Sequence, residues 1–305
     1  MTTMRKTFAQ RAALLTTVAA LGACGGATAG GAEAGEAPAP STSESGTAVS
    51  AGGRGPAVLY EAADTTVYVL QRQDSLTFQY QNNQSQTQRS DRTLFLRVAI
   101  GSEVGTAGRA FSVTLDSVRP DTTTPAQIAE LLKQAEGTQW TGTITANGEL
   151  SALTPSKASA MGDQMAGMFG MLLPVLPEGG ARAGAEWTDP DTTTTKGATS
   201  SSSETSTTRY TAVGGDTVSG APRGTRALAV RAETTTSESG TIDMGGQAME
   251  TQGSGVRRVR YVLAVDSGAL LASEGTDSTS MTITVPALGQ TVPVTRIGRF
   301  TLQRR

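Results

Sequence analysis

The chain has 305 residues, a formal net charge of −2, no histidine and a single cysteine. The missing histidine removes the commonest general base and the base of Ser-His-Asp hydrolases, and with only one cysteine the usual zinc ligand sets are missing too. The net charge is close to neutral, whereas nucleic-acid-binding proteins usually carry a clear excess of positive charge. We therefore interpret the basic runs Arg257–Arg260 and Arg304–Arg305 as solvated strand faces. We therefore expect a protein that is not an enzyme, holds no metal or cofactor and does not bind nucleic acid.

The first 23 residues have the three parts of a secretory signal. Arg5, Lys6 and Arg11 are basic, the stretch Ala12–Ala20 is apolar, and small residues follow. The apolar stretch is about nine residues long, much shorter than the roughly 20 that a membrane-spanning helix needs. We predict a signal peptide over residues 1–23.

The only cysteine, Cys24, follows Leu21, Gly22 and Ala23. This order resembles the bacterial lipobox, Leu-small-small-Cys, with Gly and Ala in the reverse of their usual places. The resemblance implies cleavage before Cys24, a thioether-linked diacylglycerol on its sulfur and an acyl chain such as palmitate on the new amino group. Two chains already give stable anchoring. Gly25 in place of Asp implies sorting to the outer membrane, where we expect the lipoprotein to face the periplasm. The alternative is an ordinary signal peptide in which Cys24 has no role.

Residues 24–56 consist mainly of Ala, Gly, Ser, Glu, Thr and Pro and offer almost nothing to bury. Such a segment cannot offset the entropy of ordering, so we predict a disordered tether. A flexible chain of this length spans roughly 30 Å. It would hold a folded domain, predicted over residues 57–305, away from the bilayer.

Beyond Val58, apolar residues recur at every second position, which is typical of antiparallel strands with one buried and one wet face. Asn147-Gly148 predicts a type I′ hairpin turn. The Ser/Thr-rich segment 192–208 has no apolar face, and we favour a polar hairpin over a loop because Thr prefers strands. The clearest alternations cover Leu76–Tyr80, Leu94–Ile100, Phe111–Leu115, Trp140–Thr145, Val259–Val265, Met281–Val285 and Phe300–Leu302.

Two segments show helical spacing instead. The first is predicted near residues 125–136, with Thr124 as N-cap, Pro125 at the first helical position and Gln127 completing a capping box. The second is predicted near residues 155–173, beginning at Thr154 and ending before Pro174. Its apolar face would consist of Met161, Met165, Met168, Phe169, Leu172 and Leu173.

Asp189 and Asp191, in the sequence EWTDPD, come nearest to a catalytic or metal-binding cluster. A carboxylate pair can hydrolyse glycosides. A calcium loop, however, needs further acidic ligands and a glycine, which are missing around this pair. We interpret the segment as a Pro-containing loop.

Aromatic residues make up only 4% of the chain, too little bulk to fill a thick core between two sheets. We therefore predict a mainly β (α+β) fold, with one large curved antiparallel sheet or half-barrel and two helices on its concave face. This architecture resembles the half-barrel carriers of the Lol type and the mycobacterial lipid-binding lipoproteins.

The segment LLPVLPEGGARAGAEW is similar to a Leu-Pro, spacer, Val-x-x-Gly-Asp-x-Trp pattern of an uncharacterised family of bacterial envelope lipoproteins. Leu176, Pro177, Gly184 and Trp187 match the pattern, whereas Ala185-Glu186 departs from its Gly-Asp step. Neither resemblance assigns an activity or a binding residue.

Two hypotheses follow for the methionine-rich helix. In the first, it plugs the concave face, and the domain is a non-enzymatic structural or interaction module. In the second, its six apolar residues face a cavity that holds lipid or acyl chains, for which adaptable methionine side chains are suited. The partners would be the membrane, through the lipid anchor, and either another envelope protein or a hydrophobic ligand. A cavity above roughly 300 Å³ under the helix would count against the first hypothesis.

Overall fold

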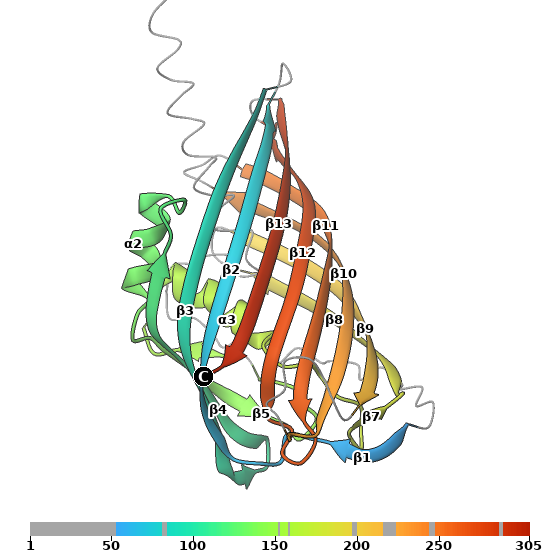
Figure 1. Ribbon diagram of the computed structural model, residues 1–305. Helices are drawn as coiled ribbons and strands as arrows, with labels where there is room; N and C mark the ends of the chain where they lie inside the picture. Colours follow the sequence, from blue (N-terminus) through green and yellow to red (C-terminus); the bar gives the residue numbers. More distant parts are fainter. Residues whose placement is uncertain are drawn as a thin grey trace, which may run out of the picture.

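A computed structural model describes residues 53–80, 84–151, 153–157, 159–196, 200–215, 224–243, 248–286 and 289–305. The predicted signal peptide, Cys24 and most of the predicted tether lie outside these residues. An 11-stranded antiparallel sheet dominates the described chain, and a two-stranded sheet and two helices accompany it (Figure 1). The predicted mainly β fold built on one large curved sheet is therefore confirmed.

The large sheet consists mostly of long strands whose neighbours in sequence are also neighbours in space. The exception is at its centre, where the first and last long strands pair and Leu70 lies opposite Leu302. This pairing joins the two halves of the domain into one sheet. Its spatial order is β6 (Thr154–Pro155), β5 (Gln139–Ile144), β4 (Gly108–Pro120), β3 (Gln84–Gly105), β2 (Asp64–Tyr80), β13 (Gln290–Arg304), β12 (Leu270–Val285), β11 (Ala248–Ala264), β10 (Ala227–Asp243), β9 (Ser200–Gly215) and β8 (Glu186–Lys196).

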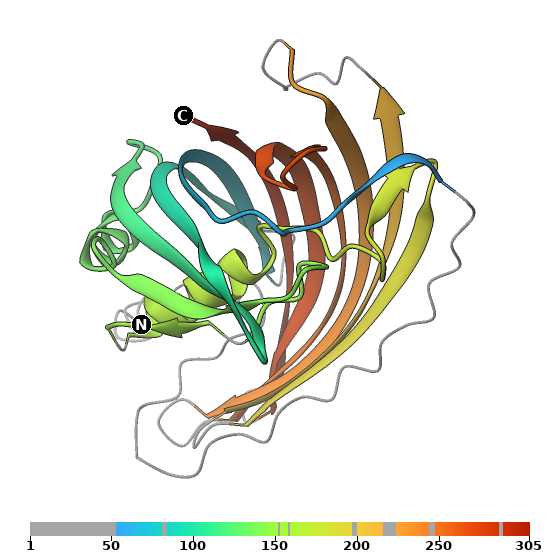
Figure 2. The ribbon, with the colours of Figure 1, turned by 90° about the horizontal axis from the view of Figure 1, so that it is seen from below.

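The two faces of the sheet differ in burial. Along β2, Leu70 and Phe78 are buried, whereas Gln71 and Gln73 are exposed, as the alternation of a strand requires. We call the face of Leu70 the inner face, because α3 (Ala160–Gly170) lies against it in the hollow of the curved sheet (Figure 2). The opposite side is the outer face.

The first helix, α2 (Ala126–Gln134), packs beside β4, and its Leu132 joins the main core. The predicted capping box is wrong. Pro125 occupies the N-cap position without a side-chain cap, because the Thr124 hydroxyl donates to the Asp91 carbonyl, 2.8 Å away.

The second helix begins later than predicted. Thr154 and Pro155 pair with β5 as the short strand β6, so α3 starts only after Ser159. The Ser159 hydroxyl accepts a hydrogen bond of 3.0 Å from the Gly162 amide, which satisfies one of the free N–H groups at the helix start.

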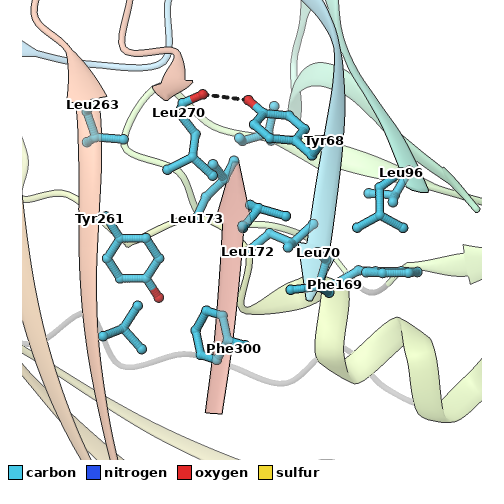
Figure 3. Close-up of a cluster of buried hydrophobic side chains, with 14 of the residues drawn as sticks. Tyr68, Leu70, Leu96, Phe169, Leu172, Leu173, Tyr261, Leu263, Leu270 and Phe300 are labelled. Carbon is cyan, nitrogen blue, oxygen red and sulfur yellow. Dashed lines mark hydrogen bonds between the residues drawn. The ribbon is translucent and has the colours of Figure 1, made fainter. Parts of the chain in front are cut away.

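The main core lies between α3 and the inner face (Figure 3). The Trp140 indole, fully buried, packs edge-on against Phe169 and donates to the Gly162 carbonyl at 2.7 Å. The Tyr68 hydroxyl donates to the Leu270 carbonyl at 2.7 Å. Each large apolar side chain buried in this way contributes roughly 1.5–3 kcal/mol, so α3 is held mainly by packing.

A small second sheet pairs β1 (Arg54–Val58) with β7 (Ala181–Ala183). β1 begins inside the last three residues of the predicted tether. The chain then passes close to the turn between β11 and β12. A Cβ atom on Gly268, where φ is +70°, would lie 2.0 Å from the Leu59 carbonyl oxygen, so this contact requires glycine.

Two turn predictions had different outcomes. The polar hairpin is confirmed, because β8 and β9 pair with Thr192 opposite Thr205. The two-residue type I′ turn at Asn147-Gly148 is wrong. The turn runs from Thr145 to Gly148, whose amide donates to the Thr145 carbonyl, and the flanking strands are joined by a bridge from Ile144 to Leu150.

Candidate functional site

The apolar residues of the methionine-rich helix lie in the core. Met161, Met165, Phe169, Leu172 and Leu173 are buried in the main cluster, and Met168 packs against it partly buried. Figure 3 shows Phe169, Leu172 and Leu173 directed at side chains of the sheet.

The space beside this helix is small. A cavity of about 120 Å³ lies next to its C-terminal end, lined by Met168 and Met171 and by residues of the sheet that are mostly polar or charged, with Val256 and Met281 among them. Small-molecule sites typically have about 300–1,000 Å³. A hollow filled in this way favours the plugged interior over a lipid cavity.

The inner face also holds a buried group of ions, which we call the inner charge cluster: Arg72, Asp74, Arg92, Asp277 and Arg296. Asp74 receives ion pairs from Arg72 and Arg92 at 2.9 Å and from Arg296 at 3.2 Å. Asp277 receives them from Arg72 at 3.0 Å and Arg296 at 3.5 Å. The five side chains are only 9–14% exposed.

Burial alone would raise the pKa of Asp74, but the three arginines outweigh it and hold that pKa well below its ordinary value. The cluster joins β3 and β2 to β13 and β12, so it bridges the pairing of the first and last long strands. We assign it a structural role at this seam of the sheet.

Gly298 provides the room for these ions. It lies on the inner face opposite both Asp74 and Asp277. A Cβ atom at Gly298 would come within 2.6 Å of the Asp277 carboxylate oxygens. A glycine inside a central strand weakens it, and here the close approach of a charged side chain explains its presence.

Carboxylates also face one another further along the inner face. Glu204 and Glu238 lie directly opposite across β9 and β10. Burial raises the pKa of both, and the neighbouring Glu238 raises that of Glu204 further, whereas Arg296 opposes the shift of Glu238. These groups favour the protonated form more than exposed glutamates do.

Asp189 and Asp191 lie in strand β8, so their interpretation as a loop is wrong. Pro190 fits there because β8 is an edge strand, which can lack one amide donor. Burial, followed by the neighbouring Asp191 carboxylate and Glu149, raises the pKa of Asp189.

Within the described ranges, no group of three or more His, Cys, Asp or Glu side chains is arranged to hold a metal ion.

The outer face holds a larger feature, an open hollow of about 1260 Å³ that we call the outer trough. It crosses the sheet from β4 to β9, and the side chains projecting into it form two rows that follow the strand pairing. The first row is Thr211, Arg231, Arg260, Glu274, Thr301, Gln71, Thr93 and Arg119, and the second is Arg209, Glu233, Arg258, Thr276, Arg299, Gln73 and Asp91.

Two ion pairs lie inside the trough. Arg258 pairs with Glu233 at 2.8 Å and Arg260 with Glu274 at 3.6 Å. Arg258 and Glu233 are 66% and 52% exposed, so water screens their attraction strongly. The surface is polar, cationic and wet, in contrast to the inner face.

Sequence reasoning identified neither charged feature as a site. For the inner cluster a signal existed: Arg72 and Asp74 occupy the same alternating positions as the apolar Leu70 and Leu76, so their inward direction could have been inferred. The outer trough depends on the pairing of strands far apart in the sequence, which the chain alone does not reveal. The predicted lipidation residue, Cys24, lies outside the described residues.

No helix within the described part of the chain is long and apolar enough to cross a membrane. No known protein family matches the sequence, and no curated protein resembles it significantly.

Solved structures are similar only at a low level. Neisserial surface protein A shares 6% identity over 79% of this chain and 99% of its own, with a TM-score of 0.20. DynF, from the dynemicin biosynthesis pathway of Micromonospora chersina, shares 12% identity over 87% of this chain and 92% of its own, with a TM-score of 0.22. Scores this low assign neither a fold family nor an activity.

Proposed function

We propose that this protein is a lipid-anchored lipoprotein of the bacterial envelope, and that its β domain is a non-enzymatic structural or interaction module. The anchor rests on Cys24, which follows a secretory signal and the lipobox-like Leu21-Gly22-Ala23. The observation that carries the role of the domain is its filled hollow: α3 and its buried apolar residues occupy the inner face. Such a domain would act through contacts between its surface and other molecules of the envelope.

The anchoring is tested with the variant Cys24→Ser. Without a thiol no diacylglycerol can be attached, so the variant should lose palmitate labelling almost completely and move from the membrane fraction to the soluble periplasm. The neighbouring substitution Ala27→Ser is the matched control and should remain with the membrane. A Cys24→Ser protein that still sediments with membranes and still takes up label would refute the lipobox assignment.

The second candidate function, a carrier of acyl chains, has one observation in its favour. Met168 and Met171 line the cavity at the end of α3, and Met171, the residue that follows the helix, is 41% exposed, so the end of the helix borders accessible space. A carrier would co-purify with bound lipid, which native mass spectrometry detects. The proposed module would give the mass of the protein with its covalent anchor and no additional bound lipid.

A further inference from the structure

The cationic side chains of the outer trough outnumber its acidic ones. Apart from Arg72 and Arg92, which belong to the inner charge cluster, six arginines line the trough against four carboxylates, and two of these six are paired with glutamates. These residues are Arg119, Arg209, Arg231, Arg258, Arg260 and Arg299, with Asp91, Asp121, Glu233 and Glu274. The local excess of positive charge contrasts with the net charge of −2 of the whole chain.

The placement of these arginines is unfavourable for the isolated sheet. Arg231 lies directly opposite Arg260, and like charges in that position destabilise a strand pair. Arg209 lies opposite Glu233, which pairs with Arg258 instead. Within the described part of the chain, Arg209, Arg231 and Arg299 make no ion pair. An anionic ligand would relieve this repulsion and engage the three guanidinium groups.

The chemistry between the arginines indicates what else the ligand offers. Threonine hydroxyls and glutamine amides, such as Thr276, Thr301 and Gln71, fill the remaining positions of the rows. They suit a partner rich in hydroxyl groups. Guanidinium forks bind carboxylates with two parallel hydrogen bonds.

The same surface disfavours other polyanions. The backbone groups of these central strands are engaged in the sheet ladder, so an acidic peptide could not add as a further strand. Single-stranded nucleic acid is usually held by exposed aromatic rings. Among the described residues that line the trough, Phe300 is the one aromatic residue, and its ring is buried in the core on the inner face.

The trough is long enough for a polymer. Its rows cross from β4 to β9, and neighbouring strands lie about 4.8 Å apart, so they extend over roughly 30 Å. This length corresponds to several sugar units of an extended chain.

We propose that the outer trough binds an acidic polysaccharide, whose carboxylates engage Arg209, Arg231 and Arg299 and whose hydroxyls meet the threonine and glutamine side chains. This inference goes beyond the proposed function and does not depend on it, because the trough belongs to the described domain whether or not Cys24 is lipidated.

The test measures binding of polygalacturonate oligosaccharides of about ten units to the full chain, purified in a non-ionic detergent. The variant Arg209→Gln/Arg231→Gln/Arg299→Gln should lose at least about tenfold in affinity. The control Arg54→Gln/Arg226→Gln/Arg305→Gln has the same change in net charge at exposed positions away from the trough and should stay within about twofold. The control should unfold at nearly the temperature of the parent, and the trough variant at that temperature or slightly above it, because it removes the repulsion between Arg231 and Arg260. Raising the salt concentration should weaken the binding of the parent more than that of the trough variant, because ion pairs on an exposed surface are screened.

Probes of other chemistry decide the specificity. Neutral dextran should not bind, and poly-glutamate, an oligodeoxynucleotide and vesicles with anionic lipid should bind at least about tenfold more weakly than polygalacturonate. Equal binding of any of these polyanions, an equal loss in the two triple variants, or no saturable binding of polygalacturonate would overturn the proposal. None of these results bears on the Cys24→Ser experiment, so the two proposals fail separately.

Discussion

The two faces of the large sheet use the same charged residues in opposite ways. On the inner face, Arg72 and Asp74 are 9% and 13% exposed. They form ion pairs with each other and with the three other members of the inner charge cluster. On the outer face, Arg258 and Glu233 form a pair that is 66% and 52% exposed. Figure 1 shows α3 behind β3, β2 and β13, on the side of the sheet that holds the inner charge cluster. Burial therefore decides whether an arginine belongs to the fold or stays available for a partner.

The energetic reason is desolvation. An exposed pair gains little, typically 0–1 kcal/mol, because water competes with the partner. A buried pair loses its hydration on folding, so removing one partner leaves an uncompensated charge and costs several kcal/mol. Three substitutions test this contrast, from the largest expected effect to the smallest.

Asp74→Ala should have the largest effect. It would leave three buried arginines around the single remaining aspartate, Asp277, and we expect a loss of about 3 kcal/mol in the free energy of unfolding. Urea titration of the full chain measures this change. The control is Asp116→Ala, which removes the partner of Arg97 at an exposed pair and should cost less than about 1 kcal/mol. Similar losses in both variants would contradict the distinction between the faces.

Gly298→Ala should have an intermediate effect. Its new Cβ atom would lie 2.6 Å from the Asp277 carboxylate, so the ions must shift, and we expect a loss of about 2 kcal/mol. Gly105→Ala, in β3, is the matched control. Its Cβ would meet nothing closer than 3.4 Å, and thermal unfolding should change little. An unchanged unfolding temperature for Gly298→Ala would show that the cluster has spare room.

Glu238→Gln should have the smallest effect, and its sign depends on pH. Burial raises the pKa of Glu238 in the folded state, so the folded protein holds this proton more tightly than the unfolded chain. The stabilisation that protonated Glu238 gives to the folded state is thus present at low pH, and it is lost as the pH rises above the ordinary glutamate pKa of 4.5. The substitution also removes the repulsion with Glu204, so at pH 7.5 we expect a rise of about 1–2 °C in the unfolding temperature.

At pH 4.5 the gain from Glu238→Gln should be smaller, because part of the parent protein is then protonated at this site. Differential scanning calorimetry at the two pH values measures the difference. Glu103→Gln, an exposed glutamate on β3, serves as the control. A gain that grows towards acid pH would contradict the assigned direction.

Much of the fold could be predicted from the sequence, because alternation is a local property. The strands around Leu94, Phe111 and Phe300 and the polar hairpin were recognisable from spacing and residue type alone. The starts of both helices were not. Thr124 and the Thr154-Pro155 step have the chemistry of helix starts, but tertiary contacts engage them instead: the Thr124 hydroxyl bonds to Asp91, and Thr154-Pro155 pairs with β5.

The charged features show the same limit more strongly. Each arginine of the outer trough is an ordinary strand residue by itself, and only the register of the β10–β11 pairing puts Arg231 next to Arg260. For Cys24 the situation is reversed, since the sequence motif alone supports its lipidation and the described residues do not include it.

The pairing of β2 with β13 has a consequence for biosynthesis. Residues some 230 positions apart, such as Leu70 and Leu302, meet at the middle of the sheet. Pairings between such distant residues form slowly, whereas the hairpins on either side can form as soon as they emerge. Until β13 arrives, β2 has a long unpaired edge, a surface prone to aggregation. A chain that lacks its last strand, or whose last strand has not yet been synthesised, should therefore depend on a chaperone to shield that edge.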